Sequence, residues 1–194
     1  MSNTKFESAI SLFDEANLKD PNKEEYKGTT YAKEYLYGLR MSNRMDIFMP
    51  DAPEALKLSA RCQHICRWEI PRNTYPMDRV GYFKWRNELK KLHAEKAGAI
   101  LTKCGYDNET IEQVQFVLLK KQLKKNELTQ ALEDVICLVF LEFYFDEFGV
   151  KHEEAKLIDI VQKTWAKMSE KGHEAALELP FSAEGLALVK KALA

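Results

Sequence analysis

Hydrophobic residues recur along most of this chain at intervals of three and four, which is the spacing of one face of an α-helix. Residues 153–170 are typical, because Leu157, Val161 and Trp165 fall on one side and Lys, Glu and Gln on the other. No segment shows the sustained alternation of a half-buried strand. The pattern therefore predicts an all-α fold. The expected helices lie near 4–18, 30–48, 54–69, 81–104, 109–123, 127–148, 153–170 and 182–193.

Several helix ends are marked by the residues that usually begin or end a helix. Residues 4–7, Thr-Lys-Phe-Glu, form a capping box at the first predicted helix. Gly105 and Gly172 each follow a helical run, as a glycine just past a helix end does. Segments 18–28 and 70–80 are polar and contain prolines, so both are expected to be loops.

The composition favours one folded domain. The chain has 194 residues, of which 45% are hydrophobic and 30% charged, so it can bury a core of its own. No repeat or low-complexity tract interrupts it. We therefore expect a single domain over residues 1–194, a compact multi-helix bundle on whose core the predicted helices 153–170 and 182–193 pack.

Charge and hydropathy limit the classes of partner that the chain is expected to bind. Twenty-nine Lys+Arg against 30 Asp+Glu give a net charge of -1, so the basic excess of a protein that binds nucleic acid without sequence preference is missing. The longest apolar run, 135–145, is too short to span a bilayer, and the first ten residues lack the features of a signal peptide. The sequence predicts a cytoplasmic protein with no membrane or nucleic-acid partner and without disulfides, and leaves a homo-oligomer open.

Four ionisable residues fall on apolar stripes of four different predicted helices. They are Glu34, His64, His93 and Asp134. For each one alone, a satisfied core residue is the ordinary interpretation. A buried charge must be paired or metal-bound, however, and buried ion pairs rarely add net stability. Because four such residues occur together, the pattern predicts a site rather than packing alone.

Arginines and aromatic residues alternate from residue 61 to residue 96. Guanidinium groups bind phosphate or carboxylate through paired hydrogen bonds, and aromatic rings can stack on a base. The segment predicts a pocket for an anionic, nucleotide-like ligand, although surface salt bridges and helix caps would explain the same arginines. The candidate ligand-binding residues are Arg61, Arg67, Trp68, Arg72, Arg79, Arg86 and Lys96.

Two stretches resemble a known family. Residues 60–72, ARCQHICRWEIPR, continue to Tyr75-Pro76, Gly81-Tyr82 and Trp85-Arg86, and residues 132–135 read LEDV. These motifs resemble an uncharacterised bacterial and fungal family catalogued as domain of unknown function 4202, over about residues 6–148. That family name implies no activity.

A more distant likeness is to the HD-domain phosphohydrolases, helical enzymes that hold metal ions with histidines and aspartates from separate helices. Gln63-His64 stands where the His-Asp doublet of these enzymes would be, and the segment that begins with His93 resembles their next helix. Asp134 resembles the last metal-binding aspartate, and Glu34 lies on the helix that would carry the first histidine. The resemblance implies an HD-domain-like core. It also implies a divalent metal, Mn, Fe or Zn, held by His64, His93 and Asp134. The first histidine of the family is missing from this sequence. If fewer than three of the candidate side chains converge, a hydrogen-bonded acid/base pair is a better interpretation than a metal site.

Three functions are therefore open. The first is a pocket that binds an anion and, with a bound metal, hydrolyses a phosphate ester. In this function Asp134 and His93 would be metal ligands or the general base. His64 would be a ligand or proton donor, and Glu34 would be a further catalytic residue. The second is a non-catalytic ligand-sensing or scaffolding protein with the same pocket. The third is a purely structural polar network in a protein that assembles through an exposed apolar patch. Residues 1–194 contain none of the common nucleotide-binding, serine-hydrolase or zincin motifs.

Overall fold

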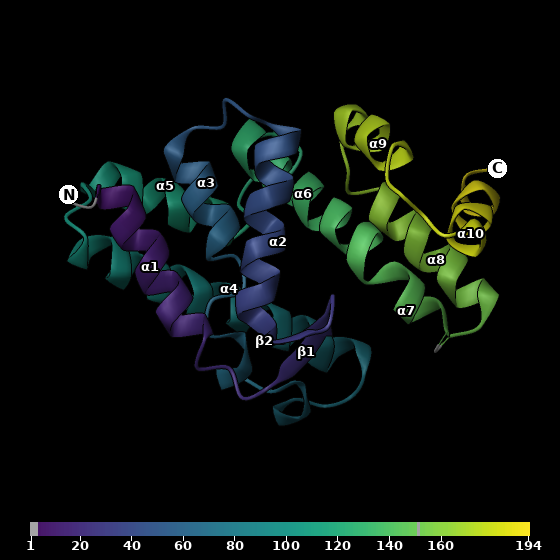
Figure 1. Cartoon of the computed structure of the whole chain (residues 1–194), viewed down its shortest axis with the longest axis horizontal. Coiled ribbons are helices and arrows are strands. Elements are labelled where there is room, and N and C mark those ends of the chain that lie inside the picture. The colour runs from purple at the N-terminus through teal and green to yellow at the C-terminus, as the bar shows by residue number, and fades with distance from the viewer. Residues whose placement is uncertain (1–3, 151) are drawn as a thin grey trace. The chain divides into compact units, whose positions relative to one another are not determined.

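The computed structural model describes residues 4–150 and 152–194. The chain divides into two compact units, Met1–Lys121 and Gln122–Ala194. Regular structure in both is helical apart from one small hairpin (Figure 1), which confirms the all-α fold. The single domain and the HD-like core stay predictions. No described helix is long and apolar enough to cross a membrane.

The first unit is built from helices of very different length. Its elements are α1 (Lys5–Asn17), β1 (Lys23–Tyr26), β2 (Thr29–Ala32), α2 (Lys33–Phe48), α3 (Glu54–Arg61), the 3-10 turns η1 (Arg67–Glu69) and η2 (Arg72–Thr74), α4 (Arg79–Lys103) and α5 (Asn108–Leu118). The Thr4 capping box begins α1 as predicted. Helix α3 packs against α1, α2 and α5, and α4 packs against α1 and α5.

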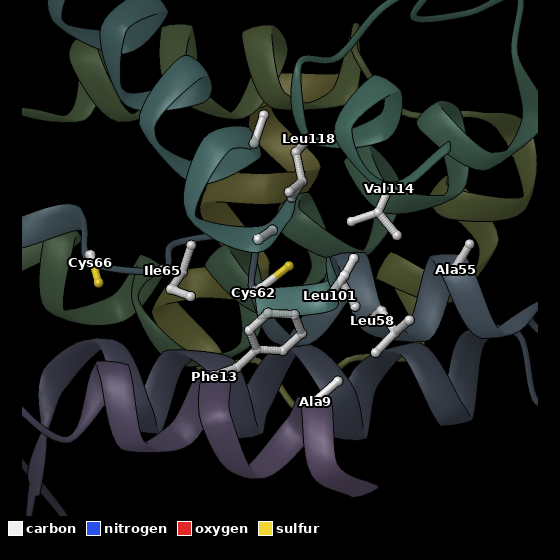
Figure 2. Packing of buried hydrophobic residues seen from close by; sticks show 12 residues of the cluster. Ala9, Phe13, Ala55, Leu58, Cys62, Ile65, Cys66, Leu101, Val114 and Leu118 are labelled. Atoms are coloured by element: carbon white, nitrogen blue, oxygen red, sulfur yellow. The ribbon is translucent and has the colours of Figure 1, made fainter. Parts of the chain in front are cut away.

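The core of the first unit lies between α1, α3, α4 and α5. Figure 2 shows the ring of Phe13 pointing from α1 toward Cys62 and Leu101, with Val114 and Leu118 of α5 on the far side. All five side chains are buried. This apolar cluster fixes the turns that follow α3 against α4. His64 lies in these turns and His93 on α4.

The hairpin corrects the prediction of a loop followed directly by a helix from residue 30. Strands β1 and β2 pair antiparallel, with Tyr26 opposite Thr29, and β2 leads directly into α2 (Figure 1). The turn residues Lys27 and Gly28 both have positive φ, at 49° and 77°, as a two-residue hairpin turn requires. Each strand has four residues, which is too short for an alternating pattern to stand out.

The predicted helix 54–69 ends early. Helix α3 stops at Arg61, and the chain then passes through turns in which Cys66 takes a left-handed φ of 54°. The Cys66 N–H donates to the side chain of Asn17 at 3.1 Å. A hydrogen bond from a distant residue thus replaces the next helical turn, and sequence periodicity cannot show such a bond.

The second unit is wholly helical in its described part. Its elements are α6 (Glu127–Phe143), α7 (Phe145–Val150), α8 (Glu154–Trp165), α9 (Glu170–Leu177) and α10 (Ala183–Leu193). The predicted helix 127–148 is interrupted at Tyr144, and α9 was not predicted. Gly172 was expected to end a helix but lies inside α9. The four cysteines of the chain form no disulfide in the described part.

Candidate functional site

His64 lies at the centre of a polar cluster in the first unit. Its Nδ1 is 3.1 Å from Oε2 of Glu34, on α2, and Arg67 donates from Nη1 to its Nε2 at 2.7 Å. Because a guanidinium can only donate, Nε2 must be the unprotonated nitrogen and Nδ1–H donates to Glu34. The ring of Tyr37 stacks on the imidazole at 4.0 Å between centroids. His64 is thus held as one defined neutral tautomer.

Burial and charge shift the pKa values of this cluster. Burial raises the pKa of Glu34 to about 7 against the lowering effect of Arg67. For His64, burial and the neighbouring Arg67 charge hold the pKa well below its usual value. At neutral pH the imidazole is therefore uncharged, while Glu34 is poised to gain or lose a proton.

His93, on α4, is the second imidazole of the cluster. Its ring centroid lies 5.8 Å from that of His64. Nδ1 donates to the carbonyl of Ile65 at 2.8 Å, so Nε2 carries the lone pair. Burial lowers the pKa of His93 to about 3, and the charges of Arg67 and Arg86 act in the same direction. His93 is neutral at physiological pH, with Nε2 as an acceptor.

Two guanidinium groups accompany the imidazoles. Arg67 lies over the ring of Trp85 at 4.9 Å and faces Glu34 with Nε 3.8 Å from Oε1. Burial lowers the pKa of Arg67, and the positive charge of Arg86 acts in the same direction there and at His64 and His93. It is half-buried, and among the described residues it makes no hydrogen bond or ion pair. Two cations therefore act on the imidazoles of this site.

Asn17, the last residue of α1, and Asp20, in the segment predicted as a loop, hold the cluster in place. Asp20 accepts a hydrogen bond from the backbone N–H of Glu34 at 3.0 Å. Asn17 binds the carbonyl of Glu34 at 3.4 Å and the N–H of Cys66 at 3.1 Å. The left-handed conformation of Cys66 then directs the chain into η1, which carries Arg67. A non-glycine residue in this conformation costs about 1 kcal/mol, so the packing enforces it.

Asp134 lies in the second unit and has partners there. Its Oδ1 accepts from the N–H of Ser169 at 2.8 Å and from Gln130 at 3.0 Å, and its Oδ2 accepts from the Ser169 hydroxyl at 2.6 Å. Gly172 passes so close that a Cβ there would lie 2.7 Å from Oδ1. A side chain could not fit, which explains why this glycine sits inside α9.

The same arrangement occurs a second time in this unit. Asp146 accepts from the hydroxyl of Ser182, the N-terminal cap of α10, at 2.9 Å, and a Cβ at Gly185 would lie 2.6 Å from Asp146. Each aspartate thus fixes a serine that caps a helix, three residues before a glycine. The negative charge is also favourable at a helix N-terminus. The surroundings of Asp134 are those of a structural residue.

The remaining predicted ligand-binding residues are placed elsewhere in the first unit. Arg61 binds both carboxylate oxygens of Asp14, at 2.7 and 2.6 Å. Lys96 pairs with Glu69 at the surface, and Trp68 packs on the apolar cluster. These three residues have ordinary structural partners.

Arg72 and Arg79 lie closer to the aromatic residues of α4. Arg72 donates to the carbonyls of Tyr75 and Asp78 and lies 5.8 Å from the Trp85 ring. Arg79 is exposed and lies over Phe83. Of the predicted arginines, Arg67 and Arg86 accompany the imidazoles.

The cluster does not suit a divalent metal. Both nitrogens of His64 are engaged, one of them by a guanidinium, and Nδ1 of His93 is bound to a carbonyl. Within residues 4–150 and 152–194, no three His, Cys, Asp or Glu side chains are grouped so that they could hold a metal ion. The neighbouring Arg67 and Arg86 charges would repel a cation.

Four residues that contact or influence the His64–His93 cluster were not among the site residues predicted from the sequence. Tyr37 stacks on His64, Asn17 and Asp20 brace the backbone, and the charge of Lys120 lowers the pKa values of both imidazoles. Lys120 belongs to a lysine run that is ordinarily a solvated helix end. The sequence signal was at Asn17, which follows Ala9 and Phe13 at four-residue intervals and so puts an amide on the apolar stripe of α1, where it requires partners.

These features define a class: an all-α protein whose first unit holds a recessed cluster of neutral imidazoles and arginines. A family model described as Domain of unknown function (DUF4202) matches residues 7–189. The chain belongs to this family, and the match reaches further than the sequence motifs indicated. Neither the curated proteins nor the solved structures contain a match to the chain.

Proposed function

We propose that the first unit binds an anionic, phosphate-bearing small molecule, with Arg67 and Arg86 as the anchoring cations. The observation that carries this proposal is Arg86. Its guanidinium is half-buried and has no hydrogen-bonded or ionic partner among the described residues. Its positive charge acts on a second guanidinium and on two uncharged imidazoles, so this region has a cation without an acceptor. An anion would provide the missing acceptors.

The two imidazoles fit the same ligand. Nε2 of His93 is an acceptor, so it would bind a protonated phosphate oxygen or another donor of the ligand. His64 holds Arg67 through Nε2 and is itself braced by Glu34. The aromatic rings of Trp85 and Tyr82, at 4.9 Å from Arg67 and 5.9 Å from Arg72, would support a planar group of the ligand.

A ligand-sensing or scaffolding role follows more directly from this geometry than hydrolysis. Metal-dependent hydrolysis requires three converging ligands and an open coordination position, and the described residues do not supply them. We therefore propose binding without turnover.

The test is a thermal-shift panel of phosphate-bearing metabolites in the presence of EDTA. A ligand at one hundred times its Kd stabilises the folded state by about 2.7 kcal/mol, so a true ligand should raise Tm by several degrees. The stabilisation should fall by about half or more in Arg86→Met and persist in Lys96→Ala. A panel without any stabilising compound would contradict the proposal, as would equal stabilisation of Arg86→Met.

A parallel arm adds Mn²⁺ to the stabilising compounds and measures release of phosphate. We expect none above the rate of the compound alone. Turnover that depends on Mn²⁺ and is lost in His93→Gln would replace binding by hydrolysis as the function of the site.

A further inference from the structure

Helix α4 has two faces of opposite character. Trp85, Leu89 and His93 are buried, and they fall on one side of the helix. The other side is exposed along its first three turns. We name this side the outer face of α4, defined by Val80, Phe83, Lys84, Asn87 and Lys91, all of which are exposed. Their spacing of three and four residues places them in one row.

The start of this face is apolar. Met77, just before α4, has 76% of its surface exposed, Val80 63% and Phe83 53%. Single exposed apolar residues are common, but a row of three within seven residues is a typical feature of an interaction surface. The guanidinium of Arg79 lies over the Phe83 ring at 5.7 Å, so the apolar end also carries positive charge.

The row continues into a groove of about 440 Å³. Three lysines line it, Lys84, Lys90 and Lys91, against one acidic residue, Glu88, while Tyr75 supplies an aromatic wall. Lys91 pairs with Glu88 at 2.8 Å. Lys84 makes no hydrogen bond or ion pair with any residue in the described part of the chain. The groove therefore has a net positive charge and at least one cation open to a partner.

We propose that the outer face of α4 docks an acidic peptide segment of another protein, whose carboxylates enter the lysine-lined groove and whose large apolar side chain packs on Met77, Val80 and Phe83. Charge complementarity selects the acidic character of the partner. The apolar residues beside the groove require an anchor side chain, as interface hot spots do.

The shape of the surface favours a peptide over the other anionic partners. A concave groove receives individual side chains, whereas a bilayer presents a flat surface to the protein. A nucleic acid would be bound by stacking aromatic residues, and two of the three exposed apolar residues, Met77 and Val80, are aliphatic. An acidic peptide uses both the groove and the aliphatic row.

The test is a selection from a random twelve-residue display library on the full chain. Bound peptides are counter-selected on Lys84→Glu/Lys91→Glu. The control is Lys156→Glu/Lys163→Glu on α8, which has the same seven-residue separation, the same charge change and exposed lysines, one of them likewise paired to an acid. Circular dichroism confirms that each variant is folded.

We expect the selected peptides to be rich in Asp and Glu and to contain a large apolar residue. Synthetic copies should bind Lys84→Glu/Lys91→Glu at least tenfold more weakly than the unaltered chain and the control variant. Phe83→Ser should weaken binding severalfold. Arg86→Met should leave it unchanged, which separates this surface from the proposed ligand site.

Three results would overturn the proposal. The first is a selection in which no peptide distinguishes the unaltered chain from Lys84→Glu/Lys91→Glu. The second is the recovery of discriminating peptides that are basic or uncharged. The third is loss, in this variant, of binding to phosphatidylserine vesicles or to a single-stranded oligonucleotide while acidic peptides bind both proteins equally.

Discussion

Glu34 and Asp134 are two carboxylates on apolar helix stripes, with 7% and 2% of their surfaces exposed. Asp134 accepts three hydrogen bonds from neutral donors, Ser169 and Gln130, and so fixes the start of α9. Glu34 instead faces an imidazole and a guanidinium, and burial raises its pKa to about 7. The difference teaches that burial alone does not identify a functional carboxylate. The chemistry of its partners separates the two roles.

The largest expected effect falls on the structural carboxylate. Asp134→Ala leaves buried donors of Ser169 and Gln130 without an acceptor, so we expect a loss of about 3 kcal/mol in the free energy of unfolding. Asp146→Ala, at the exposed counterpart, should cost only about 1 kcal/mol. Urea denaturation measures both. Equal losses in the two variants would show that burial of the carboxylate does not determine the loss of stability. A folded Asp134→Ala variant that no longer binds phosphate would show that Asp134 belongs to the ligand-binding site.

The role of Glu34 should instead appear in the pH dependence of the free energy of unfolding. Its pKa of about 7 lies above the ordinary 4.5, so the folded protein binds a proton first as pH falls, and Glu34 contributes about 2 kcal/mol of added stability between pH 7 and pH 5. His93 acts in the opposite direction, because its pKa is lowered to about 3. Glu34→Gln should therefore lose about 2 kcal/mol more than the unaltered protein over this interval. Parallel stability curves from denaturation at each pH would refute the raised pKa.

A substitution of Arg86 tests the proposed ligand site while both carboxylates stay unchanged. Arg86→Met removes one anchoring cation, and we expect the affinity for a phosphate-bearing ligand to fall about tenfold or more, since a charge-assisted hydrogen bond contributes about 1.5–3 kcal/mol. Stability should stay equal or rise, because a half-buried cation without a partner among the described residues is removed. Calorimetric titration and thermal unfolding measure the two quantities. A severe loss of stability with no change in affinity would favour the purely structural network.

The smallest expected effect, on both stability and ligand affinity, is that of Lys96. It was predicted to bind ligand, yet it pairs with Glu69 at the surface, with 39% of each side chain exposed. Lys96→Ala should change stability by less than about 0.5 kcal/mol and affinity by less than about twofold. The same titration checks this value, and a larger loss of affinity would extend the site to the surface.

Helices with local end markers could be predicted from the sequence, whereas elements fixed by distant contacts could not. The Thr4 capping box marks α1 correctly. Gly172 resembles a helix end, but its place inside α9 depends on the approach of Asp134. The turns after Arg61 depend likewise on Asn17.

The candidate site could be predicted in part for the same reason. Helical periodicity places Glu34, His64 and His93 among apolar neighbours, and the structure brings these three together. The pattern could not separate them from Asp134, because the partners of a buried group come from elements far away in the sequence. Nor could it show that Arg67 and Arg86, among the predicted arginines, accompany the imidazoles.

The most direct test of the account is an NMR titration that observes the imidazole nitrogens of His64 and His93 while inorganic phosphate, or the best ligand of the thermal panel, is added. Before addition, both rings should show the neutral Nδ1–H tautomer at pH 7. We expect both sets of signals to shift with the occupancy of the site, and the midpoint of the titration to move to about tenfold or more higher ligand concentration in Arg86→Met. Ligand binding that leaves both imidazoles unperturbed would contradict the central claim.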